Sequence, residues 1–242
     1  PHGPDPMITL PKVWTSKLKN GIGVWGIKNS ELPLVQYNLV IEGGHLLDPV
    51  EKSGVASFLA AMLTEGTQNR TPEELEEVID LLGARISVNA GTESITISVN
   101  TLARNFEKTL AIVEEILLEP RWDEEQFNLI KMRTLNNLKR NQANPTWLAA
   151  SAFRQLVYGD GHILATETSG TAETVENITM DDLKAYYSRN LSPKVTRMHI
   201  AGDIDSKRVN RATKNLVARW KPFDVQMPEI KFPEPPSAPK IY

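Results

Sequence analysis

The sequence predicts an α+β domain with a mainly antiparallel sheet and helices packed on one face of that sheet. The first observation is that the strand-like segments arrive in pairs along the chain. Residues 21–28 and 34–41 are rich in Val, Ile, Tyr and Trp and enclose a turn, and residues 85–89 and 94–100 alternate apolar with polar side chains. The second observation is that helical periodicity fills the intervals between these pairs. Consecutive strand pairs favour antiparallel pairing over a doubly wound parallel sheet.

Helix boundaries are marked by capping residues. A first helix is expected between Ser53, a candidate N-cap, and Gly66. A second begins at Thr71-Pro72-Glu73-Glu74, a capping box with Pro at the first helical position, and closes at Gly83. The remaining expected elements are helices over 106–117, 127–138 and 147–157, capping boxes at Asp123 with Gln126 and at Thr179 with Asp182, a strand over 195–201, and a helix over 207–220.

Composition excludes several function classes. The 242 residues carry 27 Lys and Arg against 30 Asp and Glu, and these charges are interleaved, so the chain lacks the basic stripe of a nucleic-acid-binding protein. No Cys is present, which excludes disulfides, a thiol nucleophile and Cys-ligated zinc. No run approaches the roughly 18 apolar residues of a membrane span. We therefore expect neither a nucleic-acid partner nor a membrane span.

Proline is concentrated at both ends of the chain. Residues 1–17 and 222–242 are expected to be Pro-rich linkers that flank a single domain over residues 18–221, as in a piece of a longer protein.

Common catalytic motifs are missing from the sequence. There is no G-x-G-x-x-G, no P-loop and no G-x-S-x-G. The four histidines are widely spread (His2, His45, His162 and His199), so a helical pair of zinc-binding histidines is absent. An unrelated enzyme that uses His45, Asp48 and Glu51 stays open as an alternative, although their spacing shows no triad-like arrangement.

The segment 54–67, Gly-Val-Ala-Ser-Phe-Leu-Ala-Ala-Met-Leu-Thr-Glu-Gly-Thr, resembles the zinc helix of the insulinase/pitrilysin family of zinc metallopeptidases, the inverted zincins. That helix reads G-x-A-H-x-x-E-H-x-x-x-x-G-T, with two His that bind zinc and a Glu that activates water. Ser57, Ala60 and Ala61 occupy those three slots here. The third ligand of the family, a later Glu, falls on Asn137, 76 residues after Ala61. The resemblance therefore implies a degenerate site that binds no metal.

Further matches keep their order along residues 18–221, among them Gly43-Gly44, Asn89-Ala90 and Gly202-Asp203. In catalytic members, the resemblance implies, the edge strand at this hairpin pairs with the backbone of the peptide substrate. Asn89, Ala90, Gly91 and Thr92 are therefore the candidate substrate groove. The alternative is a plain hairpin turn in which Gly91 supplies a positive φ.

The resemblance implies two halves that close around an unfolded peptide, only one of which carries zinc. The leading hypothesis is a non-catalytic domain that helps to enclose the peptide and packs against the zinc-bearing half, while this chain itself binds no cofactor. The alternative is a purely structural subunit, similar to the core subunits of the respiratory cytochrome complex that share this fold. The small residues around Ser57, Ala60 and Ala61 are expected to pack under the helix of Asn137, with a remodelled ligand pocket as the alternative. A bacterial periplasmic or cytoplasmic location is expected, but the sequence does not select between them.

Overall fold

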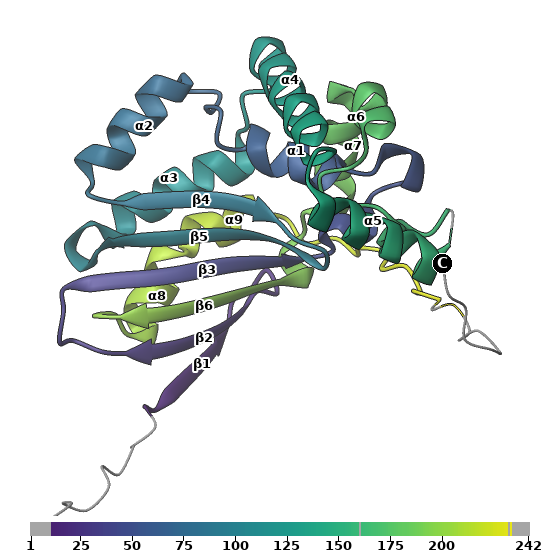
Figure 1. Cartoon of the computed structure of the whole chain (residues 1–242). Helices are drawn as coiled ribbons and strands as arrows, with labels where there is room; N and C mark the ends of the chain where they lie inside the picture. The colour runs from purple at the N-terminus through teal and green to yellow at the C-terminus, as the bar shows by residue number, and fades with distance from the viewer. Residues whose placement is uncertain (1–10, 160, 232, 234–242) are drawn as a thin grey trace, which may run out of the picture.

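A six-stranded sheet organises the chain in the computed structural model, which describes residues 11–159, 161–231 and 233 (Figure 1). The strand order is β1-β2-β6-β3-β5-β4. All neighbouring strands are antiparallel except β2 and β6, which are parallel. The predicted α+β class with a mainly antiparallel sheet is confirmed. The strands are β1 Val13–Lys17, β2 Gly23–Lys28, β3 Leu34–Glu42, β4 Arg85–Ala90, β5 Ser94–Leu102 and β6 Thr196–Gly202.

The helices of the described residues follow most of the predicted caps. They are α1 Val55–Met62, α2 Pro72–Leu81, α3 Phe106–Leu118, α4 Glu124–Asn141, α5 Pro145–Tyr158, α6 Ala172–Asn177, α7 Met180–Asn190, α8 Ser206–Ala212 and α9 Lys214–Arg219. The capping boxes at Thr71 and Thr179 are confirmed. Asp123 accepts hydrogen bonds from two backbone N–H groups of α4 without the reciprocal bond of a box. The single helix expected over 207–220 is two helices, because the chain turns at Thr213 between α8 and α9.

Strand β1 lies within the segment expected to be a linker. Val13–Lys17 pairs antiparallel with β2, with Thr15 beside Trp25. The ring of Trp14 occupies the space that a side chain at Gly26 would need, so that glycine allows the two strands to pack closely. The predicted linker over residues 1–17 therefore includes an ordered strand at Val13–Lys17. Pairing with the backbone of β2 and the packing of Trp14 over Gly26 order this strand. Residues 222–231 contain no helix or strand, while residues 1–10 and 234–242 lie outside the described part of the chain.

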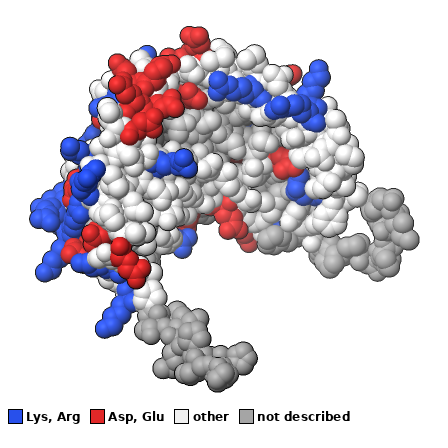
Figure 2. Space-filling model, turned by 60° about the vertical axis from the view of Figure 1, so that its left-hand side comes forward, with Lys and Arg blue, Asp and Glu red and all other residues white. Residues whose placement is uncertain are grey.

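The sheet has one covered and one open face. Figure 1 shows α3, α8 and α9 behind the sheet, and α1 with α4 to α7 at one end of it. The covered face and its helices form the core, with Tyr37, Leu39, Ile97, Val99, Met198, Phe106, Leu110, Val113, Val209 and Leu216 all buried. Figure 2 shows a hollowed, mostly uncharged surface with acidic and basic side chains gathered at its rim. Successive side chains point to opposite faces of a strand, so the helices that pack behind the sheet bury only one of the two sets of side chains.

A buried carboxylate joins α3 to α9 beneath the sheet. Glu114 accepts hydrogen bonds from the side chain of Asn215 and from the backbone N–H of Leu216, the latter at 3.1 Å. Burial raises the pKa of the Glu114 carboxyl above its usual range. The folded state therefore binds the carboxyl proton of Glu114 more tightly than the unfolded chain does.

We predict that Glu114 makes stability fall as the pH rises. A raised pKa in the folded state contributes stability at pH values below the unfolded pKa, and that contribution is lost as the pH rises through the folded pKa. In Glu114→Gln the free energy of unfolding should rise relative to the wild type as the pH is raised from 4 towards neutrality, as measured by urea denaturation at each pH. Exposed Glu76 provides the control, and Glu76→Gln should follow the wild-type profile. Identical pH profiles for the wild type and Glu114→Gln would contradict the assignment.

Candidate functional site

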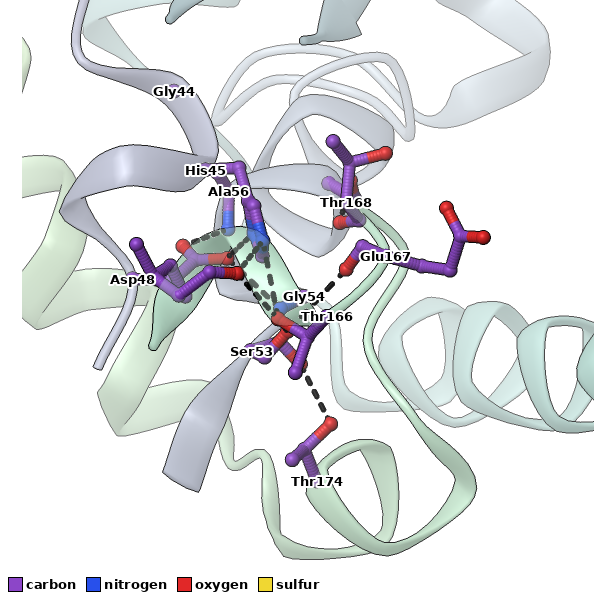
Figure 3. Close-up of polar contacts among 12 residues, drawn as sticks. Gly44, His45, Asp48, Ser53, Gly54, Ala56, Thr166, Glu167, Thr168 and Thr174 are labelled. Atoms are coloured by element: carbon purple, nitrogen blue, oxygen red, sulfur yellow. Dashed lines mark hydrogen bonds and ion pairs between the residues drawn. The ribbon is translucent and has the colours of Figure 1, made fainter. Parts of the chain in front are cut away.

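Helix α1 carries three of the four degenerate zinc slots and packs against β4, α4 and α7. It begins after Gly54, whose φ is +110° and whose Cβ, if present, would come within 3.0 Å of the backbone of Ser169. The expected N-cap at Ser53 is wrong, because the Ser53 hydroxyl is directed to Thr166 and to the carbonyl of Glu167. Asp48 caps the helix instead, accepting from the backbone N–H groups of Gly54 at 2.8 Å and Ala56 at 2.9 Å (Figure 3).

Asp48 also pairs with His45. The Nδ1 atom of His45 lies 3.0 Å from Oδ2 of Asp48, and the two residues are 1% and 6% exposed. On the other side of the ring, Nε2 lies 3.1 Å from the carbonyl oxygen of Ile163 and 3.2 Å from the hydroxyl of Thr166. The sequence placed His45 and Asp48 only in an open constellation with Glu51 and did not predict that they pair, although the His-x-x-Asp spacing was a usable signal.

The pair of His45 and Asp48 is a structural clamp rather than a catalytic dyad. Both carboxylate oxygens of Asp48 accept backbone N–H groups, and each ring nitrogen of His45 faces a protein partner. Glu51, the third member of the alternative constellation, is exposed in a short 3₁₀ turn over Val50–Lys52. The clamp joins the turn Gly44–Leu47, the start of α1 and the segment Ile163–Ala165 (Figure 3).

The four degenerate slots have different surroundings. Ser57 donates a 2.6 Å hydrogen bond to the carbonyl oxygen of Thr168. Ala60 is buried and Ala61 is half-buried. Asn137 is exposed on α4 and accepts a hydrogen bond from Arg140. The small-residue face is thus closed in part by the segment around Thr168, while α4 packs on α1 through Phe127 and Phe58, whose ring centroids are 6.0 Å apart.

These residues do not fit a zinc ion. Zinc in a catalytic site needs three protein ligands with lone pairs, and the two Ala methyl groups offer none. The hydroxyl of Ser57 already donates a hydrogen bond to the backbone carbonyl of Thr168. Within residues 11–159, 161–231 and 233, no group of three or more His, Asp or Glu side chains could hold a metal ion.

The candidate substrate groove lies at the sheet edge beside α1. Asn89 and Ala90 end β4, the last strand in the sheet order, and Asn89 is exposed. The turn that follows is held by backbone bonds, from His45 N–H to the carbonyl of Gly91 and from Leu46 N–H to that of Thr92, each at 3.0 Å. Gly91 lacks the positive φ proposed in the alternative of a plain hairpin turn, because these bonds and the bond from Gly91 N–H to the carbonyl of Ser94 close the turn without a left-handed residue.

Helix α5 forms the far wall of a cavity next to this turn. The cavity has a volume of about 600 Å³ and is lined by Thr92 and Glu93 together with Phe153 and Val157 of α5. The outward face of α5 is apolar, with Leu148, Phe153 and Leu156 between 45% and 66% exposed. Its charged residue, Arg154, is paired with Glu167. Among the described residues no helix, α5 included, has the length and apolar character needed to cross a membrane.

Comparison with known proteins identifies the family. The sequence profile of the insulinase family, peptidase family M16, matches residues 26–186, and the chain belongs to this family. It is 26% identical over 201 residues to an uncharacterized zinc protease of Rickettsia bellii, a match that covers 83% of this chain and 48% of that protein. Subunit 1 of the cytochrome b-c1 complex of Bos taurus is 22% identical over 206 residues, covering 83% of this chain and 42% of that protein.

The fold is likewise shared with a solved structure. The crystal structure of a peptidase M16 inactive domain from Pseudomonas fluorescens superposes with a TM-score of 0.86 at 23% identity, covering 94% of this chain and 55% of that one. This chain therefore spans about half the length of each of these three proteins.

We predict that Asp48→Ala destabilises the domain by about 3 to 5 kcal/mol, because it leaves two buried N–H groups and a buried imidazole without their partner. Asp48→Asn keeps one acceptor oxygen and should cost less. Chemical denaturation of both variants gives the comparison. Exposed Glu51 provides the matched control, since Glu51→Gln should change stability by less than about 0.5 kcal/mol. Equal losses for Asp48→Ala and Glu51→Gln would rule out the clamp.

Proposed function

We propose that this chain is a non-catalytic domain of a zinc metallopeptidase assembly, where it helps to enclose a peptide and packs against a zinc-bearing half. One observation carries the proposal. The segment 54–67, which contains α1, keeps the family frame at Gly54, Ala56, Gly66 and Thr67, yet its three slots and the fourth on α4 have lost the side chains that the family uses. A helix retained without its ligands is explained by a role in packing and shape.

The sheet edge supports the peptide-enclosing part of the proposal. An unpaired edge strand presents backbone N–H and C=O groups that an extended peptide can pair with. Strand β4 ends the sheet beside α1, and Asn89 and Thr92 are exposed at its end. In this arrangement β4 would orient a peptide, and hydrolysis would occur at zinc held by the partner half.

The apolar face of α5 supports the pairing part of the proposal. A solvated helix face carries charged and polar side chains, whereas this one exposes Leu148, Phe153 and Leu156. Burial of such a face against another domain removes apolar surface from water. The family match and the twofold greater length of the matched proteins support a second domain or subunit as the partner.

A purely structural subunit is the second candidate, favoured by the similarity to subunit 1 of the cytochrome b-c1 complex. The two candidates differ in the partner. A partner with an intact H-x-x-E-H supports the enclosing role, and a partner without that motif supports the structural one.

The experiment measures hydrolysis of a quenched fluorescent peptide by the chain alone and together with a family member from the same genome that carries H-x-x-E-H. We expect no hydrolysis by the chain alone, with or without added Zn²⁺. The mixture should hydrolyse the peptide at least tenfold faster than the partner alone, and 1,10-phenanthroline should abolish that activity. Chelator-sensitive cleavage by the chain alone would contradict the proposal, and a stable complex without any rate increase would favour the structural role.

A further inference from the structure

The open face of the sheet carries a hollow that the degenerate site does not use. Its volume is about 300 Å³, and it lies across β1, β2, β6 and β3. The residues that line it are Val13, Trp25, Gly26, Ile27, Gln36, Asn38, His199, Ile200 and Ala201, of which Ile200 contributes backbone because its side chain is buried on the covered face. Val13, Trp25 and His199 lie outside the residues that match the family profile.

Trp25 forms one wall of this hollow, although 40% of the residue is exposed. Its indole lies over Gly23, where a Cβ would come within 2.6 Å of the ring. Gly23 therefore leaves the room that allows the ring to lie along the sheet. The centroids of the Trp25 and His199 rings are 5.7 Å apart, and the ring planes are inclined at 50°. Val13, on the neighbouring strand β1, is 58% exposed.

Charge on the open face is placed asymmetrically around the hollow. In the sheet register, Gly23 pairs with Lys17 on one side and with Arg197 on the other. Lys17 and Arg197 are both exposed, and Arg197 forms an ion pair with Glu42. Lys17 and Arg197 form a basic row at the level of Gly23. Gly23 lies four residues along β2 from Ile27 in the floor of the hollow, which is about 13 Å at the usual rise of a strand.

The rest of the open face is polar and mostly uncharged. Beyond the hollow, the residues in register are Ser87, Asn89, Thr96, Ser98 and Asn100, together with Val40 and with the exposed Arg85 at the start of β4. Amide and hydroxyl groups donate and accept hydrogen bonds, so they suit a peptide backbone of any sequence. We therefore expect selectivity on this face to come mainly from the hollow and from the row of Lys17 and Arg197.

We propose that the hollow is a subsite for one aromatic or large aliphatic side chain of an extended peptide, and that an acidic residue four positions away in that peptide meets Lys17 and Arg197. The side chain packs between Trp25, His199 and Val13, and an extended peptide spans the distance to the basic row. The proposal rests on the peptide-enclosing role, and it adds a preferred peptide chemistry to that role.

The test is fluorescence anisotropy of labelled 13-residue peptides with the 242-residue chain at low salt. The parent peptide has a central Phe, a Glu four residues before it and another four residues after it, among Ser and Ala. Replacing Phe by Ala should weaken binding about tenfold, within the range for aromatic contacts. Replacing both Glu by Lys should weaken it about fivefold, as expected for exposed ion pairs.

Protein variants locate the subsite. Trp25→Ala should abolish the preference for Phe over Ala, and Gly23→Ala should reduce it by displacing the ring. The matched control is Leu81, an exposed apolar residue of α2 that is 78% exposed, and Leu81→Ala should bind like the wild type. Lys17→Glu should lower the preference for the Glu peptide about threefold and raise affinity for the Lys peptide, a reversal that loss of folding cannot produce.

The outcomes separate this proposal from the proposed function. Peptide binding that ignores the Phe and Glu replacements, or that Trp25→Ala and Lys17→Glu leave unchanged, overturns the subsite. In that case, accelerated hydrolysis in the mixture with the H-x-x-E-H partner still upholds the enclosing role. Absence of any binding by the chain likewise overturns the subsite, while the hydrolysis assay decides the enclosing role independently.

Discussion

The arrangement around α1 depends on the buried carboxylate of Asp48. A carboxylate removed from water is stable only when its oxygens are hydrogen-bonded. Asp48 meets this requirement through two backbone N–H groups at the start of α1 and through His45. The first turn of a helix provides such donors, because its N–H groups have no partner within the helix. One side chain therefore fixes where α1 starts and what lies next to it.

This clamp extends to the surrounding loops. The Nε2 atom of His45 lies within hydrogen-bond distance of the carbonyl oxygen of Ile163, and the backbone N–H of His45 donates to the carbonyl of Gly91 in the hairpin turn. The hydroxyl of Tyr186 in α7 donates to the carbonyl of Gly44. Gly44 is required at this crossing, because its φ is +54° and a Cβ would come within 2.5 Å of the Gly91 carbonyl oxygen. The sheet edge and the degenerate helix are thereby held together without any metal ligand, so the fold can persist when the ligands are lost.

The proposed contacts use three exposed surfaces: the β4 edge, the apolar face of α5 and the open face of the sheet. Each presents a different chemistry, namely backbone pairing, apolar burial, and an aromatic hollow near two cations. An enclosing domain needs such surfaces more than it needs reactive groups, because it contributes orientation and exclusion of water while the chemistry takes place elsewhere.

The sequence by itself determined the features that repeat locally or match a motif. Strand alternation and capping boxes predicted most elements, and the frame around Ser57, Ala60 and Ala61 predicted the family and the missing donors. Only the tertiary structure decided the position of β1, the cap of α1 and the hollow at Trp25. β1 is a five-residue strand whose order comes from pairing with β2, and the cap of α1 lies on Asp48, outside the local pattern at Ser53. The hollow brings together Val13, Trp25 and His199 from three strands, and their proximity follows from the sheet register, which no local periodicity encodes.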